Sequence, residues 1–133
     1  MYKKLMELAV EARKTSYAPY SKYKVGAALV GKSGKIYSGC NVENASYTPT
    51  NCAERTAFFK AISEGEREFS AIAIVAGKEG EALSKSCSPC GVCRQVMTEF
   101  CDKDFKIILG TPEDYKVYTL EEMMPFSFTK DEL

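Results

Sequence analysis

The sequence contains no histidine among its 133 residues, so metal binding and proton transfer must fall to other side chains. An excess of charge of one sign is also missing, because 18 basic residues balance 18 acidic ones. No basic run is long enough to follow a phosphate backbone, which argues against a nucleic-acid partner. The composition, 45% apolar and 27% charged, is that of an ordinary globular protein and indicates neither disorder nor membrane insertion.

The start of the chain lacks the apolar core of a signal peptide, because charged residues are already frequent among the first seven positions. The last four residues, Lys130–Leu133, spell the retrieval signal of the endoplasmic reticulum, which a receptor reads only in the lumen. With no import signal beside it, we interpret this match as a coincidence. The six cysteines are then expected to be reduced thiols, and the protein is expected to be cytoplasmic and without a membrane partner.

The length fits a single domain over residues 1–133, which would bury roughly two-thirds of the surface that the unfolded chain exposes. Hydrophobic periodicity predicts helices over residues 5–13 and 52–64 and a third helix that follows Pro89 and runs through Phe100. It predicts strands over residues 25–30, 36–40, 72–76 and 105–109, the first two joined as an antiparallel hairpin by a turn at Gly34. This alternation predicts an α/β layered domain with a mixed sheet.

The chemistry is concentrated in two short motifs. Cys52 and Glu54 flank Ala53, and Cys90 and Cys93 follow in the second motif. Three thiolates can hold a zinc ion and leave its fourth tetrahedral position to water, and a nearby carboxylate can move that water's proton. In a chain without histidine, Glu54 is the natural general base. Both motifs open predicted helices, where unpaired N–H groups and the helix dipole lower thiol pKa values.

Three thiolates on a divalent ion leave a net negative charge, which would weaken the pull of the ion on its water. Arg55 follows Glu54 directly and is the predicted source of compensation, because a guanidinium can donate hydrogen bonds to sulfur and stays charged. Arg94, next to Cys93, is a second candidate.

Other interpretations of these cysteines remain open. Cys87, Cys40 or Cys101 can supply the fourth ligand of a closed structural zinc site. The spacing of Cys87, Cys90 and Cys93 also suits an iron–sulfur cluster, although the expected cysteine–proline pair is missing. Cys90 and Cys93 alone have the spacing of a redox dithiol. Away from the motifs, Cys40 and Cys101 are interpreted as inert residues among apolar neighbours.

Four stretches together resemble the small, all-cysteine class of cytidine deaminases: Ser21–Leu29, Gly39–Ala45, Thr50–Ala57 and Ser88–Gln95. The resemblance spans nearly the whole chain. It implies a three-layer α/β/α fold with a mixed sheet of about five strands, one zinc ion per chain, and hydrolysis of cytidine and 2′-deoxycytidine to uridine and 2′-deoxyuridine with release of ammonia. Glu54 would take the proton of the zinc-bound water, deliver it to ring N3 and then protonate the leaving amine.

The same resemblance implies roles in substrate binding. Asn41 and Glu43 would bind the 3′-hydroxyl of the sugar, and Tyr23 would lie beside the base or sugar. The backbone N–H of Ala53 would bind the pyrimidine carbonyl, and the carbonyl of Ser88 would accept from the exocyclic amine. The pair Tyr23-Lys24 is a departure, because many relatives carry phenylalanine and proline there.

A homotetramer is also implied, with Phe128 and Tyr47 reaching into the pocket of a neighbouring subunit. The apolar tail agrees with this expectation, because a solvated terminus rarely carries so many apolar side chains: Leu120, Met123, Met124, Phe126 and Phe128.

Three rival functions follow from the same motifs. A deaminase of a cytosine antibiotic such as blasticidin S shares the zinc chemistry, but Asn41, Glu43 and Arg55 favour the nucleoside enzyme. Deaminases of RNA or DNA bases would need a basic channel, which the balanced charge does not suggest. A zinc-stabilised interaction module without turnover is the alternative from another class.

Overall fold

A mixed sheet of five strands forms the centre of the computed structural model, which describes all 133 residues. The strands lie in the order β2-β1-β3-β4-β5. Only β3 and β4 run parallel, and the other neighbouring pairs are antiparallel. The strands are β1 (Tyr23–Gly31), β2 (Ile36–Cys40), β3 (Phe69–Lys78), β4 (Lys106–Thr111) and β5 (Asp114–Thr119).

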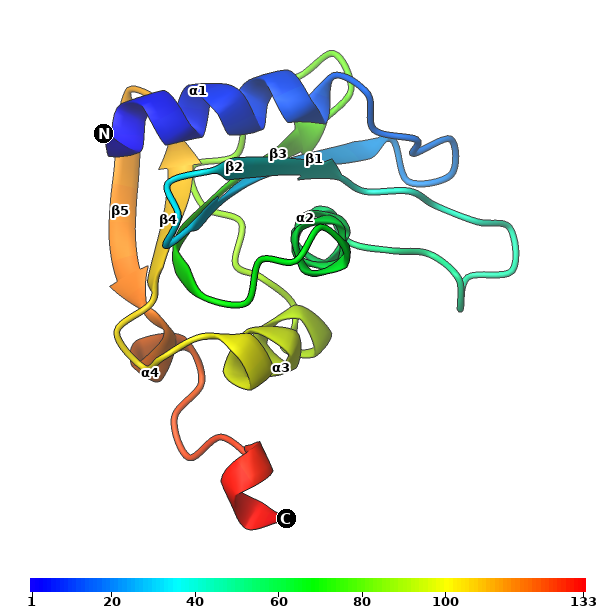
Figure 1. Cartoon of the computed structure of the whole chain (residues 1–133). Helices are drawn as coiled ribbons and strands as arrows, with labels where there is room; N and C mark the ends of the chain where they lie inside the picture. Colours follow the sequence, from blue (N-terminus) through cyan, green and yellow to red (C-terminus); the bar gives the residue numbers. More distant parts are fainter.

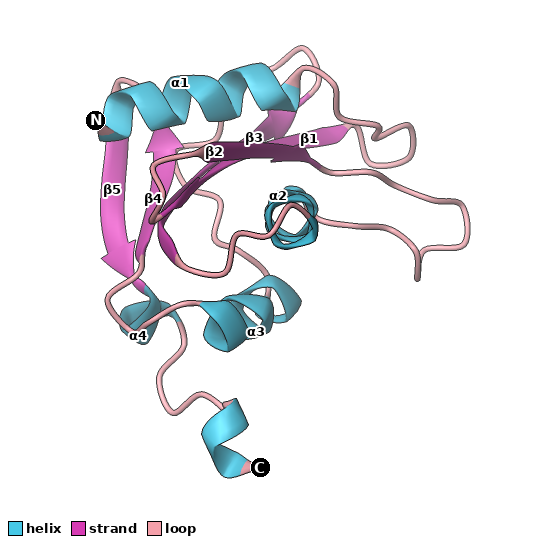
Figure 2. Cartoon of the chain, viewed as in Figure 1, coloured by secondary structure: helices cyan, strands magenta, loops and turns pink.

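Helices cover both faces of this sheet, which confirms the expected three-layer arrangement (Figure 1). Helix α1 (Tyr2–Arg13) lies on one face, and α2 (Ala53–Ser63) and α3 (Gly91–Phe100) lie on the other (Figure 2). A short helix α4 (Leu120–Met123) and a 3-10 turn (Lys130–Glu132) follow β5. None of the helices combines the length and the apolarity that crossing a bilayer requires.

Alternation along the strands divides the core into two clusters. On β1, Ala27 and Leu29 pack with α2, whereas Ala28 and Val30 pack with α1. The same alternation continues on β3, so both central strands are buried on both sides, as helices on two faces require. Phe58 of α2 lies at the centre of the larger cluster, and its ring centroid is 5.1 Å from that of Phe69 and 6.1 Å from that of Phe105.

Two glycines on neighbouring strands let helices approach the sheet closely. A Cβ atom at Gly39 would lie 2.4 Å from the carbonyl oxygen of Ala53, so only glycine admits α2 at this distance. On the opposite face, a Cβ atom at Gly26 would lie 2.1 Å from the carbonyl oxygen of Ala9 in α1. Gly39 therefore sets how far the first turn of α2, which carries both Ala53 and Glu54, stands from the sheet.

The predicted elements are confirmed, with differences at their ends and with two elements, β5 and α4, that are absent from the predicted ranges. The strand predicted over residues 72–76 extends over Phe69–Lys78. The edge strand β5 has no counterpart among the predicted ranges, because its side chains are largely exposed and give little apolar alternation. The end of α2 is closed by Gly65 at φ +103°, a conformation that glycine adopts without strain.

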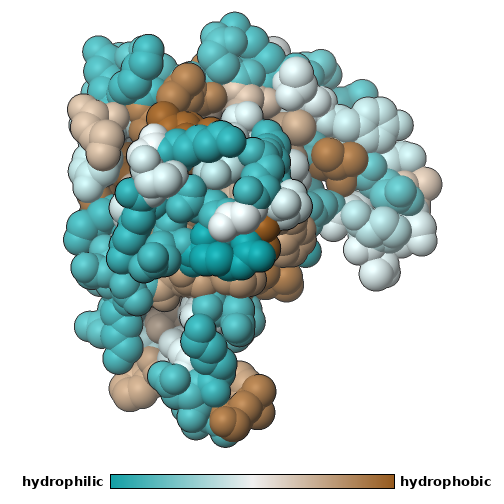
Figure 3. Space-filling model, viewed as in Figure 1, coloured by the Kyte–Doolittle hydropathy of each residue, from teal (hydrophilic) through white to brown (hydrophobic).

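The tail beyond α4 leaves the body of the protein. Phe126 and Phe128 are 106% and 60% exposed, and only the first part of the tail packs against its own chain, where Leu120 is buried. Figure 3 shows hydrophilic residues over most of the viewed face and hydrophobic ones in separate patches, near the top, along the lower edge of the body and at the end of the tail.

Candidate metal centre and substrate site

Two helix N-termini on the same face of the sheet bring the three cysteines together. Cys52 is the N-cap residue of α2 and Cys90 is the N-cap residue of α3, and both have extended backbone conformations. Neither sulfur caps its own helix, so both remain free to face a ligand. Cys93, one turn into α3, is buried and points into the same space. The prediction that both motifs open helices is confirmed.

The sulfur atoms have the spacing of tetrahedral zinc ligands. Sγ of Cys52 and Sγ of Cys90 are 3.8 Å apart, Sγ of Cys90 and Sγ of Cys93 are 3.5 Å apart, and all three lie within 4.8 Å of one another. Ligands about 2.3 Å from a tetrahedral zinc ion lie about 3.8 Å from each other, so the three thiols fit this ion. The cluster includes neither Cys87 nor Cys40 nor Cys101, which removes the support for a closed four-cysteine site.

Glu54 lies beside this cluster in the first turn of α2 and is 4% exposed. Its carboxylate is not one of the clustered metal-ligating groups. Burial, followed by the negative charge of Cys52, raises the pKa of Glu54 to about 7 against the opposing effects of its own N–H and Arg55. A buried carboxyl with a pKa near neutrality can both accept and return a proton.

Arg55 places its guanidinium against the thiol cluster. Nη2 donates to Sγ of Cys52 over 3.3 Å, and the buried Nε has no hydrogen-bond partner. Burial alone would lower the pKa of Arg55, but hydrogen bonds and charge from Cys52 and Cys93 outweigh it and raise that pKa. A thiol hydrogen bond from Cys93, helped by Arg55 and Cys90, lowers the pKa of Cys52 to about 5. The same hydrogen bond, together with burial, raises the pKa of Cys93.

Arg94 has a different task from the one that its position suggested. Its Nε donates to the carbonyl oxygen of Pro89 over 2.8 Å, and its Nη1 donates to the carbonyl oxygen of Met123 over 2.6 Å. The side chain thus joins the loop before α3 to the end of α4 and does not contact sulfur. Of these two arginines, Arg55 is the one that donates a hydrogen bond to a cysteine of the cluster.

Asn41 is buried and completes the start of β1 with its side chain. Oδ1 accepts from the backbone N–H of Val25 over 2.9 Å, and Nδ2 donates to the carbonyl oxygen of Tyr23 over 2.9 Å. This pairing fixes which amide atom is oxygen and which is nitrogen. One N–H and one lone pair of the amide remain for a ligand.

Glu43 is held by the loop that precedes β1. Oε1 accepts from the backbone N–H groups of Tyr20 and Ser21 over 3.0 and 3.1 Å, and the hydroxyl of Ser21 donates to Oε2. The hydrogen bond from the Ser21 hydroxyl lowers the pKa of Glu43 more than partial desolvation raises it. With the two backbone N–H groups, it holds this pKa below its usual range. The carboxylate is therefore ionised at neutral pH.

Residues 1–109 match the family model of the cytidine and deoxycytidylate deaminase zinc-binding region. The chain belongs to this family. It is 48% identical over 131 residues to a cytidine deaminase of Sporosarcina psychrophila, covering 98% of this chain and 93% of the relative. A cytidine deaminase of Burkholderia pseudomallei, solved by crystallography, superposes with a TM-score of 0.86 at 45% identity over 96% of this chain and 99% of that one. A blasticidin-S deaminase of Bacillus cereus is 32% identical, over 96% of this chain and 91% of the relative.

The remaining residues that the family resemblance singled out surround the cluster unevenly. Tyr23 is half-buried; burial and then a hydrogen bond with Cys87 raise the pKa of Tyr23 to about 12. Cys87 is therefore a neighbour of Tyr23 and not a metal ligand. Ala53 is the first residue of α2, so its N–H has no acceptor within the helix. Ser88 is exposed, and its carbonyl oxygen accepts no hydrogen bond.

Tyr47 and Phe128 lie at the periphery of the deaminase fold. Tyr47 belongs to the long connection between β2 and α2, which Figure 1 shows projecting from the body, and the residue is 78% exposed at φ +58°. The carbonyl oxygen of Phe128 accepts from Nε2 of Gln95 over 2.8 Å, which ties the tail to α3 while the aromatic ring stays exposed. The structure of one chain brings neither residue to the cysteines.

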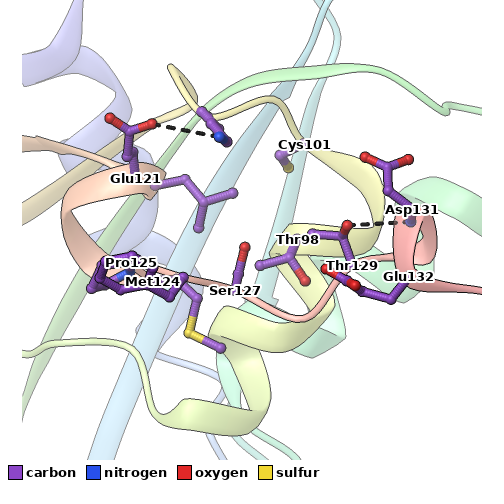
Figure 4. Close-up of a pocket in the computed structure, with 12 residues that line it drawn as sticks. Thr98, Cys101, Glu121, Met124, Pro125, Ser127, Thr129, Asp131 and Glu132 are labelled. Atoms are coloured by element: carbon purple, nitrogen blue, oxygen red, sulfur yellow. Dashed lines mark hydrogen bonds and ion pairs between the residues drawn. The ribbon is translucent and has the colours of Figure 1, made fainter.

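The cavities differ in their relation to the site. A cavity of about 320 Å³ lies against Glu43, lined also by Tyr20, Ser21, Asn44, Tyr47 and Thr50. A larger cavity, of about 580 Å³, lies between α3, α4 and the tail (Figure 4). It contains none of the residues predicted for the site, and the side chains of Thr98, Cys101 and Met124 point toward it. Size alone would have indicated the wrong place.

Two contacts near the site are not predicted by the sequence. Ser21 belongs to a stretch that matches the family, but the resemblance gives it no role, although serine is a common turn residue whose hydroxyl bonds backbone groups two residues on. Arg13 at the end of α1 donates to the carbonyl oxygens of Lys24 and Gly77 over 3.0 and 2.8 Å, holding the ends of β1 and β3 together. Nothing in the sequence near Arg13 indicates this contact.

Proposed function

We propose that the protein hydrolyses cytidine and 2′-deoxycytidine to uridine and 2′-deoxyuridine and releases ammonia. One observation carries this conclusion. Three thiols with tetrahedral spacing lie at two helix N-termini beside a buried glutamic acid, in a chain that is 48% identical to a cytidine deaminase over nearly its whole length.

Cys52, Cys90 and Cys93 would hold one zinc ion. When bound, zinc supplies a Lewis acid that makes a water nucleophilic near neutral pH. Because all three ligands must stay reduced, the protein is inferred to work in a reducing compartment such as the cytoplasm. Arg55 offsets the surplus negative charge of the thiolates through its hydrogen bond to Cys52.

Glu54 is the group that moves protons. It accepts one proton as water attacks C4 of the cytosine ring and delivers it to N3; it then takes the second proton of that water from the new C4 hydroxyl and passes it to the amine, which leaves as ammonia while the C4 carbonyl forms. The balance is one water consumed and one ammonia released, with no change in oxidation state. Burial of Glu54 keeps competing water away from its carboxylate and raises its pKa to about 7, so both proton transfers are accessible at neutral pH.

The sugar and the base are proposed to bind to different groups of the site. Glu43 would bind the 3′-hydroxyl together with the N–H and the lone pair of Asn41 that remain unpaired. Tyr23 would lie beside the base or sugar. The unpaired N–H of Ala53 and the free carbonyl of Ser88 would bind the pyrimidine carbonyl and the exocyclic amine. Each of these groups has hydrogen-bonding capacity left for a ligand.

A homotetramer is proposed because the site of one chain is open. The exposure of Phe128 and Tyr47 supports this proposal, because both side chains would be free to enter the pocket of a neighbouring subunit. The apolar side chains of the tail would be covered by the same contact. Sedimentation of the purified protein tests this assembly, and a monomer with full activity would contradict it.

A blasticidin S deaminase is the second candidate, because one such relative is 32% identical over 96% of the chain. The higher identity to cytidine deaminases favours the nucleoside. The direct test follows the ultraviolet change of cytosine to uracil with cytidine and with blasticidin S as alternative substrates. Turnover of blasticidin S alone would reverse the proposal.

Glu54→Gln is the decisive variant. It should retain zinc and fold and lose about 10²- to 10⁴-fold in kcat, the usual contribution of a general acid–base group. Glu64→Gln is the matched control, because Glu64 ends the same helix but lies on the surface and pairs with Lys35. Substantial residual turnover in Glu54→Gln would remove this residue from the mechanism.

A further inference from the structure

Ser21 joins the sugar side of the proposed site to its aromatic side. Its hydroxyl donates to Oε2 of Glu43, its backbone N–H donates to Oε1 of the same carboxylate over 3.1 Å, and its Oγ accepts from the backbone N–H of Tyr23 over 3.0 Å. One small side chain therefore connects the carboxylate proposed for the 3′-hydroxyl to the tyrosine proposed to lie beside the base or sugar.

The backbone around Ser21 is fixed independently of this side chain. The N–H of Lys22 donates to the carbonyl oxygen of Ala18 over 3.1 Å, and the carbonyl oxygen of Lys22 accepts from the N–H of Glu79 over 2.7 Å. Lys22 itself stands at φ +61°, a left-handed conformation that ends the loop sharply before β1. Loss of the Ser21 hydroxyl should therefore leave the loop in place and remove only the donor to Oε2 of Glu43.

The carboxylate of Glu43 offers about four lone-pair directions, and protein donors occupy three of them. The remaining direction is the one left for a ligand hydroxyl. Without the Ser21 hydroxyl, Oε2 would have no protein donor, and rotation about the terminal torsion, which is soft for a carboxylate, would be restrained only by the two N–H groups that donate to Oε1.

We propose that Ser21 is a positioning residue for nucleoside recognition, which aims Oε2 of Glu43 at the 3′-hydroxyl of the sugar. The inference rests on the proposed function, since it needs a nucleoside in the site. Ser21 bonds Glu43 and the backbone N–H of Tyr23 but contacts neither the cysteines nor Glu54, so the chemical step should proceed normally once substrate is bound.

The test is a comparison of two variants on two substrates. Ser21→Ala removes the hydroxyl, and Ser33→Ala is the matched control. The hydroxyl of Ser33 donates to Oε1 of Glu66 over 2.6 Å and accepts from the N–H of Lys35, the same arrangement in the β1–β2 turn. Cytidine is compared with 3′-deoxycytidine, which lacks the hydroxyl that Glu43 would bind.

Ser21→Ala should raise KM for cytidine about tenfold, the usual effect of losing one hydrogen bond to a charged group, while kcat changes less than about twofold. With 3′-deoxycytidine the same variant should match the wild type, because the positioned carboxylate has no hydroxyl to bind. Ser21→Thr, which keeps the hydroxyl, should restore most of the affinity for cytidine. Ser33→Ala should behave as the wild type on both substrates.

Equal losses on cytidine and 3′-deoxycytidine would overturn the inference and assign Ser21 a structural role only. Unchanged KM for cytidine would overturn it as well. If Ser21→Ala folds poorly, Ser21→Cys carries the same comparison, because a thiol of similar size is a weak donor. Failure of the proposed function is recognised separately, as absence of turnover by the wild-type protein with either nucleoside, and the inference would then fail with it.

Discussion

Replacing Gly39 by alanine should displace the catalytic turn of α2 from the sheet. The added Cβ atom would lie 2.4 Å from the carbonyl oxygen of Ala53 and 2.6 Å from the backbone nitrogen of Ala57. Both neighbours are backbone atoms of α2, so no side chain can rotate away. The helix must move as a body, and Cys52 and Glu54 move with it.

The size of the movement follows from the contact distances. An ordinary contact begins at 3.4 Å, so α2 must retreat by 3.4 − 2.4, or 1.0 Å, at Ala53. Overpacking of this kind costs about 1 to 3 kcal/mol of stability. A misplacement of about 1 Å at a catalytic group can lower the rate about 10²-fold. We therefore expect Gly39→Ala to lose both stability and kcat.

Two further glycine variants separate these effects. Gly26→Ala overlaps backbone atoms of α1 on the opposite face, at 2.1 Å from the carbonyl oxygen of Ala9, and should cost stability with a smaller loss of kcat. Gly91→Ala lies between two of the cysteines but has no atom within 4 Å of its added Cβ, and should stay within about 1 kcal/mol of the wild type. Thermal unfolding, zinc content and ultraviolet-monitored deamination are measured on all three.

Wild-type kcat and unfolding temperature in Gly39→Ala would refute the reasoning, because they would mean that this contact does not set the distance between α2 and the sheet. A loss of kcat in Gly91→Ala as large as that in Gly39→Ala would also refute it, since proximity to the cysteines and not displacement of α2 would then be the cause.

The remaining predictions concern Arg55, Asn41 and Glu43. Arg55→Ala should retain zinc but lose turnover at neutral pH and shift the pH–rate profile to higher pH. The reason is that the thiolate charge, no longer offset by Arg55, would disfavour loss of a proton from water. A profile identical to that of the wild type would exclude this role. Asn41→Ala should lower the free energy of unfolding in urea by about 2 to 4 kcal/mol, since it leaves one donor of Val25 and one acceptor of Tyr23 unpaired, and a loss below about 0.5 kcal/mol would contradict this. The lowered pKa of Glu43 keeps its carboxylate ionised, so KM for cytidine should stay constant from neutral pH down through the pH range in which ordinary carboxyl groups titrate, and rise only below it. KM for 3′-deoxycytidine serves as the control, and a rise of KM for cytidine already near pH 6 would be the contrary result.

Much of the fold could be predicted because its strongest signals are local. Strand β2 agrees with its predicted bounds, and α2 and β4 agree to within two residues, since each has a clear apolar period and a turn signal at its end. Strand β5 could not be assigned in this way, because it lies at the sheet edge with Lys116 and Val117 both exposed. An edge strand is defined by pairing with a neighbour, which no local window of sequence contains.

The features of the site also fall into those that local sequence determines and those that depend on packing. Residue type and near spacing determined the chemistry: a chain without histidine must use thiolates as soft ligands, and Cys90 and Cys93 meet because three residues make one helical turn. The 3.8 Å between Cys52 and Cys90, by contrast, depends on how two helices pack on one sheet face. The same packing decided that Arg55 meets sulfur while Arg94 meets carbonyl groups, and that Ser21 holds Glu43, because contacts between distant segments exist only once the sheet has brought those segments together.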